Sequence, residues 1–368
     1  MKMKMNISKS NLERALAKVV GAAKADSTLM ILANVLIEAQ EDGILKLTTT
    51  NLDIRIESTT EAKISEKGAI TVNCRRLFDI VRSFKDEDIS LTLDESTLHI
   101  SCGKSKVKLF GLSAVDYPES HGINEITSFT LPGSELALML QRVEYAVNKT
   151  DARKALTGVA LQIEKGMLYL LATDGKRLAC SEMSVDIQSE IEVIIPAFTV
   201  GCILKLATSC SDDVKIIVAE NKVFFDFGST TLISNLIDEK YIDWKRIVPS
   251  GLKHSITVPV KEMTQVLKRV AYILSEKAYF IIMKLSEGQI EASAYSSDFG
   301  FFDDCIEISG GIEKEIKINP HYFLDALQAA GTETIEMQMN KDYSPLKLIA
   351  GRYISVIMPM RDKDENEN

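Results

Sequence analysis

The residues of this chain whose types and spacing could do chemistry are few. Asp174 lies three residues before Arg177 in the segment Thr-Asp-Gly-Lys-Arg, where a carboxylate and a guanidinium could serve a hydrolytic reaction. The pair Asp174-Gly175 is also a strong signal for a tight hairpin turn. Because no nucleophile–base pair accompanies the two charges, we predict the turn and keep a hydrolytic enzyme as an alternative.

A pair of carboxylates and four histidines also lack the spacing of a catalytic or metal-binding site. Asp303 and Asp304 are neighbours in a strand-like segment, and adjacent strand residues point to opposite faces of a sheet. We therefore predict a charged edge strand there. No phosphate-binding glycine loop is present, and the histidines have no metal-ligand spacing. The histidines are His99, His121, His254 and His321. The sequence thus predicts no catalytic residue, no metal and no cofactor.

The cysteines and the N-terminal residues indicate the compartment. No two cysteines form a Cys-x-x-Cys pair, and several lie in apolar runs, which is typical of reduced, buried thiols in a cytosolic protein. They are Cys74, Cys102, Cys180, Cys202, Cys210 and Cys305. The first residues lack the apolar centre of a signal peptide, and no apolar run reaches about 18 residues. We expect a cytoplasmic protein.

Length and charge set the broad class. The chain has 368 residues, of which 46% are hydrophobic and 26% charged, as in a soluble globular protein. At about 150 residues per domain this predicts two or three domains. The formal net charge is -9, so the overall charge does not mark a nucleic-acid binder, for which a pI above about 9 is the usual sign.

A strand–turn–helix unit organises the chain. In Phe129–Val147 a short apolar strand meets a Pro-Gly corner, Ser134 is placed to cap a helix, and apolar residues recur on one helix face. The unit occurs six times, at intervals of about 60–65 residues. The starts lie near Met5, Ala69, Phe129, Val193, Ile256 and Ile316. Two units per domain give three α+β domains, at 1–125, 126–251 and 252–368, each with two helices packed on antiparallel sheets.

The predicted helices are more basic than the rest of the chain. Their combined charge is +7, which leaves about -16 for the strands and loops. A basic helical face on an acidic body is typical of a protein that tracks phosphates without reading bases. Helix faces of mixed charge exposed to solvent are the alternative. The helix spans used are 10–24, 73–85, 133–150, 197–209, 260–277 and 319–330.

Two motifs lie far apart in the chain, Leu-Ala-Thr-Asp-Gly-Lys-Arg-Leu-Ala at 171–179 and Val-Ile-Met-Pro-Met-Arg at 356–361. The first resembles the hallmark segment of one protein family, the bacterial sliding clamps that form the beta subunit of replicative DNA polymerase III, and the second resembles the C-terminal end of that family. The segments 71–81, 151–158 and 318–327 fit as well. Two distant motifs and a threefold repeat make the resemblance specific.

The resemblance implies a non-catalytic processivity subunit. It implies a ring-shaped head-to-tail homodimer that encircles duplex DNA, is placed there by a clamp loader and tethers the polymerase alpha subunit and other proteins. Geometry agrees with the dimer, because twelve helices spaced about 10 Å apart enclose a hole of about 28 Å, whereas six leave about 9 Å. A monomeric peptide-binding adaptor without a DNA role is the alternative. A sedimentation measurement that finds only monomer would favour the adaptor.

The resemblance also implies three groups of site residues. A partner-peptide pocket would comprise Leu156, Thr173, Gly175, Lys176, Arg177, Leu178, Tyr241, Ile242, Arg246, Ile247, Asn319, Tyr322, Met358, Pro359, Met360 and Arg361. DNA-facing cations would be Arg14, Lys24, Arg75, Lys149, Arg153, Lys154, Lys205 and Lys268. The dimer interface would use Arg76, Lys104, Lys106 and Leu109 on one edge, and Ile273, Leu274, Asp303 and Asp304 on the other.

The chain departs from the family pattern at several of these places. Lys176 replaces the usual His of the hallmark, Ile242 replaces a Pro, and Asp362 replaces a terminal Leu and is followed by an acidic tail. We expect the tail to screen the peptide pocket. Asp26 and the pair Ala197-Phe198 stand where basic residues are usual, which predicts a weaker contact with DNA.

Overall fold

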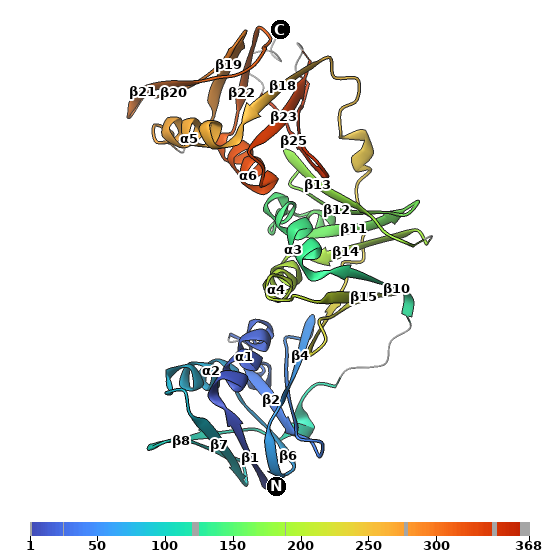
Figure 1. Ribbon diagram of the computed structural model, residues 1–368, viewed down its shortest axis with the longest axis vertical. Coiled ribbons are helices and arrows are strands. Elements are labelled where there is room, and N and C mark those ends of the chain that lie inside the picture. Colours follow the sequence, from blue (N-terminus) through green and yellow to red (C-terminus); the bar gives the residue numbers. More distant parts are fainter. Residues whose placement is uncertain are drawn as a thin grey trace. The chain divides into compact units, whose positions relative to one another are not determined.

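The computed structural model describes residues 2–24, 26–119, 125–187, 189–275, 279–340 and 344–360 (Figure 1). Its contacts divide the chain into two compact units. Unit 1 comprises Met1–Ala137 and Phe198–Leu236, and unit 2 comprises Leu138–Ala197 and Ile237–Asn368. The segment predicted as the middle domain, 126–251, therefore contributes to both units, and the predicted domain boundaries stay a prediction.

All six predicted strand–helix units are present. In unit 1, residues alternate between buried and exposed along β1, and Ser8 then caps α1 by accepting a hydrogen bond from the Asn11 amide. The same succession recurs along the chain. The six pairs are β1 (Lys2–Ser8) and α1 (Lys9–Val19), β6 (Gly68–Asn73) and α2 (Cys74–Ser83), β10 (Glu125–Pro132) and α3 (Gly133–Gln141), β14 (Ile191–Pro196) and α4 (Ala197–Thr208), β18 (His254–Pro259) and α5 (Val260–Ala271), and β22 (Lys314–Ile318) and α6 (Pro320–Ala330).

Three helices end well before their predicted ends. α1 ends at Val19 rather than 24 and is followed by a 3₁₀ turn, Val20–Ala22. α3 begins at Gly133, so Ser134 lies inside the helix rather than at its cap, and it ends at Gln141 instead of 150. A 3₁₀ turn, Glu144–Ala146, follows, in which the Tyr145 hydroxyl lies 2.7 Å from that of Tyr353. This tertiary contact overrides the helical propensity of the segment. α5 likewise ends at Ala271 rather than 277.

Unit 1 contains two antiparallel sheets. The five-stranded sheet has the order β5-β1-β7-β8-β9, and the eight-stranded sheet has the order β10-β15-β16-β17-β4-β3-β2-β6. α1 and α2 lie side by side, and the apolar face of α1 is buried against β3 and β4. The further strands are β2 (Asn34–Ala39), β3 (Ile44–Thr50), β4 (Ile54–Glu61), β5 (Lys63–Glu66), β7 (Asp88–Asp94), β8 (Thr97–Cys102), β9 (Ser105–Phe110), β15 (Asp213–Ala219), β16 (Lys222–Asp226) and β17 (Thr230–Asn235).

Unit 2 repeats this arrangement. Its eight-stranded sheet has the order β14-β11-β12-β13-β25-β24-β23-β18, and its four-stranded sheet has the order β21-β20-β19-β22. α5 and α6 contact each other through buried residues such as Leu267 and Phe323. The further strands are β11 (Gly158–Glu164), β12 (Met167–Thr173), β13 (Arg177–Ser184), β19 (Ile281–Ser286), β20 (Gln289–Ser296), β21 (Gly300–Glu307), β23 (Thr334–Met339), β24 (Leu346–Ala350) and β25 (Tyr353–Ile357).

The predicted α+β class with helices packed on antiparallel sheets is confirmed. Every strand pairing found between the named strands is antiparallel, including β4 with β17 and β13 with β25, which join segments far apart in the chain. β5 was not predicted, because its short polar sequence lacks an apolar alternation. Among the described residues, no helix has both the length and the apolar character that a membrane span needs.

Candidate functional site

The segment around Asp174 is a hairpin turn that joins β12 to β13 in unit 2. The Asp174 carboxylate accepts hydrogen bonds from the amides of Lys176, at 2.9 Å, and of Arg177, at 3.0 Å. Gly175 has φ +84°, a left-handed conformation that glycine adopts without strain. The predicted turn is confirmed. Asp174 holds the turn and the Arg177 side chain, so its carboxylate has a structural role and the hydrolytic alternative loses its support.

Arg177 is the polar centre of this region. Its side chain is 11% exposed, and its guanidinium bonds Asp174 at 3.0 Å and Asp325, on α6, at 2.6 Å. A third bond, of 2.7 Å, goes to the backbone carbonyl of Tyr145. The guanidinium also lies 4.5 Å from the ring centre of Tyr322. Arg177 thus ties the turn to α6 and to the 3₁₀ turn after α3.

A cavity of about 310 Å³ opens beside the turn, between β13 and the end of β25. Its walls are mainly aliphatic, and Lys176 supplies a charge for which no ion pair is found among the described residues. An apolar cleft of this size with few polar groups suits a short peptide or a small organic ligand. The lining residues are Arg153, Leu156, Thr173, Gly175, Lys176, Arg177, Leu178, Ile242, Ile247, Val356 and Met358.

Tyr241 and Trp244 do not line this cavity but pack behind its wall. Both belong to a buried cluster with Leu178 and Val356, whose side chains face the cavity on their other side. The Tyr241 hydroxyl donates to the carbonyl of Leu171 at 3.5 Å, and burial raises the pKa of this tyrosine. Tyr241 is therefore a neutral, rigid support for the turn.

The remaining residues predicted for the pocket have other contacts. Asn319 caps α6, where its side chain accepts from the His321 amide at 2.9 Å, and Arg246 is exposed and paired with Asp243. The Met360 amide donates to the carbonyl of Lys317 at 2.7 Å. Tyr322 stacks on Arg177, Pro359 links Met358 to Met360, and Arg361 and the acidic tail lie outside the described residues.

Two lining residues were not predicted for the pocket. Val356 lies on β25, two positions before Met358. Because side chains alternate along a strand, the sequence could have predicted that Val356 faces the same cavity as Met358. Arg153 was predicted to face DNA. Its guanidinium bonds Asp151 at 3.0 Å and lies close to Gly175, and no local pattern in the sequence shows this approach.

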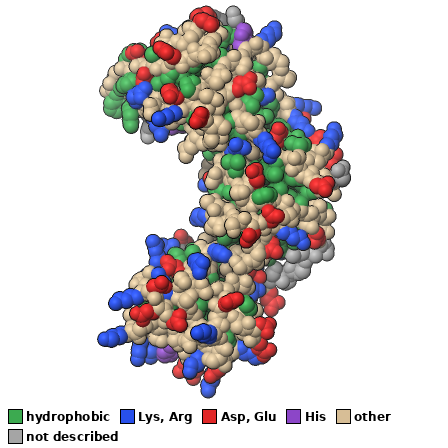
Figure 2. Space-filling view, in the orientation of Figure 1, with side chains coloured by type: hydrophobic (Ala, Val, Ile, Leu, Met, Phe, Trp, Pro, Cys, Tyr) green, Lys and Arg blue, Asp and Glu red, His purple; other side chains and the backbone are tan. Residues whose placement is uncertain are grey.

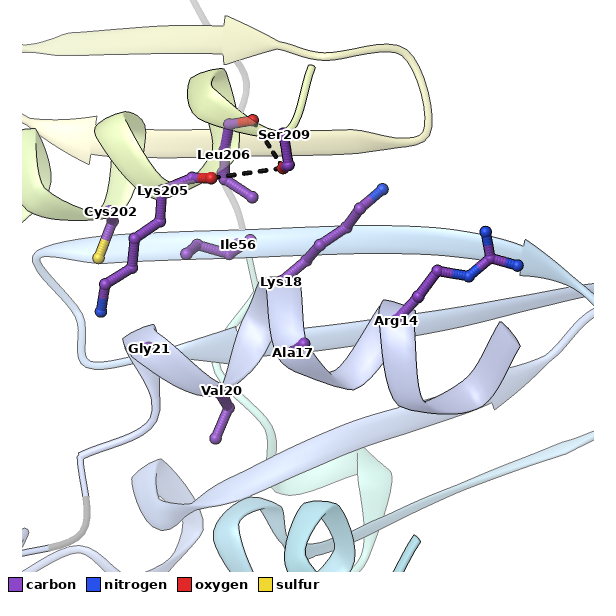
Figure 3. Close-up of a pocket in the computed structure, with 10 residues that line it drawn as sticks. All are labelled: Arg14, Ala17, Lys18, Val20, Gly21, Ile56, Cys202, Lys205, Leu206 and Ser209. Carbon is purple, nitrogen blue, oxygen red and sulfur yellow. Dashed lines mark hydrogen bonds between the residues drawn. The ribbon is translucent and has the colours of Figure 1, made fainter. Parts of the chain in front are cut away.

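A second cavity, of about 480 Å³, lies in unit 1 between α1 and α4 (Figure 3). Three cations surround its apolar floor, with Arg14 and Lys18 extending from α1 and Lys205 from α4. Arg14 bonds the Asn11 side chain at 2.7 Å, and Lys18 donates to the Ser229 hydroxyl at 3.1 Å. No carboxylate lines the cavity, and none of the three cations is ion-paired within the described part of the chain. Such a groove is suited to an anion.

The other predicted DNA-facing cations are dispersed. Arg75 pairs with Asp79 on α2 at 3.3 Å, and Lys268 lies in the last turn of α5. Lys24 and Lys149 lie beyond the ends of the shortened helices, and Lys154 begins a 3₁₀ turn. Figure 2 shows lysines and arginines interspersed with acidic side chains over the face in view. Two of the predicted cations, Arg14 and Lys205, meet at the cavity between α1 and α4, where Lys18 joins them and no carboxylate is among the lining residues.

Each unit has an edge strand that carries residues predicted for the dimer interface. In unit 1 this strand is β9, which carries Lys106 and Leu109, while Lys104 lies in the preceding turn and Arg76 on α2. Phe110 at its end is 86% exposed. Lys106, Lys108 and Phe110 share one face of the strand, because side chains alternate along it.

In unit 2 the edge strand that carries predicted interface residues is β21. The predicted edge position of Asp303 and Asp304 is confirmed, and the two side chains point to opposite faces. Asp304 bonds Arg269 on α5 at 2.6 Å, whereas Asp303 is exposed. Phe301 is 61% exposed beside them. Ile273 and Leu274 follow the C-terminal end of α5. Among the described residues, no cluster of His, Cys, Asp and Glu is placed to hold a metal.

Comparison with known proteins agrees with this architecture over the full length. The DNA polymerase III beta subunit family matches in three consecutive segments, with its N-terminal domain at residues 3–121, its central domain at 130–243 and its C-terminal domain at 245–361. The chain belongs to the DNA polymerase III beta subunit family. It is therefore a DNA sliding clamp, a processivity factor of the polymerase and not a catalytic subunit.

Individual relatives support the assignment to the beta subunit family. The beta sliding clamp of Chlamydia pneumoniae is 28% identical over 370 residues, which cover 99% of this chain and 100% of that protein. The beta sliding clamp of Pseudomonas putida is 30% identical over 368 residues, covering 98% and 100%. The crystal structure of the Pseudomonas aeruginosa sliding clamp bound to griselimycin superimposes with a TM-score of 0.93 at 27% identity, covering 98% of this chain and 100% of that one.

Proposed function

We propose that two copies of this sliding clamp close head to tail around duplex DNA and hold partner proteins by peptides in the cavity beside the Asp174 turn. A clamp loader that places the ring on DNA and the polymerase alpha subunit are the partners that this function requires. The protein acts in the cytoplasm. The observation that carries the proposal is the repeated pairing of strands between successive parts of the chain.

Two of three equivalent pairings are made within one chain. β4 of the first repeat pairs with β17, the last strand of the second, and β13 of the second pairs with β25, the last strand of the third. The third repeat offers β21, and the first repeat offers its own last strand, β9, both with free edges. A second copy supplies the missing partner for each edge, and such a heterologous contact closes into a ring when the rotation allows.

The two free edges are complementary in charge and in apolar character. β9 presents Lys106 and Lys108 beside the exposed Phe110. β21 presents Asp303 beside the exposed Phe301. Opposite charges with neighbouring aromatic side chains favour one pairing of edges and disfavour like with like.

The cations of the groove between α1 and α4 are proposed to contact the DNA backbone, with Arg75, Lys268 and the other predicted cations adding weaker contacts. Such contacts are independent of base sequence and release counterions. Replacing Lys205 with alanine should reduce the slope of log K against log salt concentration by about 1. A matched control is Lys67→Ala, because Lys67 is exposed and paired with Glu41.

The decisive experiment compares retention on circular and linear DNA. The clamp is loaded on a nicked plasmid, and half of the sample is then linearised with a restriction enzyme before gel filtration at high salt. A topological clamp should stay with the circle and slide off the linear molecule. Equal retention on both would overturn the ring and favour a monomeric adaptor.

The peptide pocket is tested separately by fluorescence anisotropy with a labelled peptide. The peptide carries Gln and a Leu-Phe anchor, the residues that the resemblance to the sliding-clamp family implies for its partner peptides. Met358 is 42% exposed at the cavity, and removing its side chain takes away part of the apolar wall. Met358→Ala should weaken binding by about tenfold, as expected for an apolar contact worth about 1.4 kcal/mol. Met30→Ala is a matched control, because Met30 is exposed in unit 1. Unchanged binding by the Met358 variant would contradict the pocket.

A further inference from the structure

The hairpin turn beside the proposed peptide pocket has a duplicate in unit 1. There β3 turns into β4 through Thr50-Asn51-Leu52-Asp53-Ile54, as β12 turns into β13 through Thr173–Arg177. The Thr50 hydroxyl donates to the Ile54 carbonyl at 2.8 Å, and the Thr173 hydroxyl donates to the Arg177 carbonyl at 2.6 Å. Both threonines also accept from the amide two residues on, at 3.1 Å in each case.

The rest of the turn is equivalent as well. The Asn51 side chain accepts from the amides of Asp53, at 3.0 Å, and Ile54, at 2.8 Å. The Asp174 side chain accepts in the same way from the amides two and three residues further on. Leu52 has φ +79° where Gly175 has φ +84°. The two turns therefore share the same hydrogen bonds and a left-handed residue at the same position.

The strand that pairs beside each turn is equivalent too. In unit 1 the amide of Asn235, at the end of β17, donates to the carbonyl of Asp53 at 2.8 Å. In unit 2 the amide of Met358, just after β25, donates to the carbonyl of Lys176 at 3.0 Å. This register matches Asn235 to Met358, Ile233 to Val356 and Arg55 to Leu178.

A cavity lies at the same place in both units, but the sizes differ. The cavity of unit 1 is about 80 Å³ and the cavity of unit 2 about 310 Å³. We propose that the unit 1 cavity is a second copy of the peptide site, which three side chains close in this chain: Leu52, Arg55 and Asn235. The inference rests on the proposed peptide pocket of unit 2, and its ligand is the same class of peptide with an apolar anchor.

Hydrogen bonds hold the side chains of Arg55 and Asn235, and the Leu52 side chain adds to the lining of the cavity. Leu52 carries a side chain where the open copy has a bare glycine, although a left-handed backbone disfavours any Cβ. Arg55 stands at the position that Leu178, an apolar residue of the cavity wall, has in unit 2. It donates to the Pro118 carbonyl at 2.7 Å and to Glu57 at 2.6 Å. The Asn235 side chain donates to the Leu52 carbonyl at 3.3 Å, so that Asn235 is linked to the turn.

The test is the stoichiometry of peptide binding by calorimetry. With the labelled Gln and Leu-Phe peptide, the native chain should bind about one peptide, because only one copy is open. The opened variant L52G/R55L/N235M carries the three residues of the open copy and should bind about two. Adding Met358→Ala to the opened variant should weaken one of the two binding events and leave the other.

A reciprocal variant keeps the inference testable if the opened variant does not fold. Gly175→Leu introduces the closing residue into unit 2, at a φ that Leu52 shows to be accessible, and its Cβ would meet only the end of the Arg153 side chain. It should lower peptide affinity by at least about tenfold, while Gly228→Leu, at an open turn with φ +79°, should not.

The possible outcomes distinguish a failure of this inference from a failure of the proposed pocket in unit 2. No binding to the native chain would overturn the proposed pocket and the inference with it. One peptide bound by a folded opened variant, or unchanged affinity of the Gly175 variant, would overturn the closed copy alone. Two peptides bound by the native chain would show that Leu52, Arg55 and Asn235 do not close the site.

Discussion

Arg177 lines the proposed peptide cavity and also holds the turn beside it in place. Its guanidinium is committed to Asp174, Asp325 and the Tyr145 carbonyl, and its side chain is 11% exposed. A charge so enclosed costs stability unless its partners are kept. Within the hallmark segment, Arg177 is thus a structural connector between the turn and α6.

Replacing Arg177 with alanine should therefore destabilise unit 2. We expect a loss of about 2 kcal/mol in the free energy of unfolding, because Asp174 and the Tyr145 carbonyl lose a charged donor in a half-buried place. Urea unfolding followed by circular dichroism measures the change. Arg246→Ala is the control, because Arg246 is 87% exposed and its ion pair should contribute about 0.5 kcal/mol or less. An equal loss in both variants would contradict the role of Arg177.

At the scale of elements, the β3–β4 hairpin depends on a charged cluster as well as on its apolar face. Lys46 lies 2.9 Å from the Glu57 carboxylate and Arg55 lies 2.6 Å from it. Burial by itself raises the pKa of Glu57, but the hydrogen bonds from Lys46 and Arg55 outweigh it, so this pKa lies below its ordinary value of 4.5. The ionised form therefore stabilises the folded hairpin.

Stability should consequently fall on acidification through Glu57. A group whose pKa is lower in the folded state contributes fully above its unfolded pKa, here about 4.5, and loses the contribution as the pH falls through the folded pKa. Glu57→Gln should cost about 1 kcal/mol at pH 7, and the difference from the native protein should vanish toward pH 3. Thermal unfolding between pH 3 and 7 measures this. A difference that does not change with pH would be evidence against the cluster.

At the scale of the whole molecule, two junctions between repeats are made within the chain, β4 with β17 and β13 with β25. We propose that the edge strands β9 and β21 form the third junction between two copies. In a head-to-tail dimer each contact joins one β9 edge to one β21 edge, so the two edges can be altered independently in different chains. That property distinguishes this assembly from a symmetric contact of like edges.

A mixing experiment uses this property. The variant K106E/K108E makes the β9 edge acidic, and the variant D303K/D304K makes the β21 edge basic. Each alone should sediment as a monomer at micromolar concentration, because like charges face each other in both of its contacts. An equimolar mixture should form a dimer, since one contact is native and the other has reversed signs. A mixture that stays monomeric would rule out the proposed pairing of edges.

The reactivity of Cys305 tests the same proposed contact between β9 and β21. Cys305 lies exposed on β21, whereas Cys74 is fully buried and burial raises its pKa to about 12. Iodoacetamide should label Cys305 slowly in the native dimer and at least about tenfold faster in the K106E/K108E monomer. Cys74 should react slowly in both, which provides an internal control in the same mass spectrum. Equal labelling of Cys305 in the two proteins would contradict a covered β21 edge.

Local sequence patterns predicted much of the fold because they reflect backbone and burial preferences. The strand–helix unit recurs six times, and the Asp174 turn and the charged edge at Asp303 follow from the identities of a few neighbouring residues. The end of α3 did not follow, since Gln141 is succeeded by a 3₁₀ turn that Tyr353 and Ser355 hold from elsewhere in the chain.

The sequence by itself determined the class of each element, the threefold repeat and the segments that form the proposed pocket. Only the tertiary structure decided that Arg177 is enclosed by Asp325 and Tyr322, that Val356 lines the cavity with Leu178, and that the copy of this cavity in unit 1 is nearly closed. The physical reason is that periodicity and turn chemistry act between neighbours in the chain, whereas the volume of a cavity and the pairing of a buried charge depend on side chains brought together from distant segments.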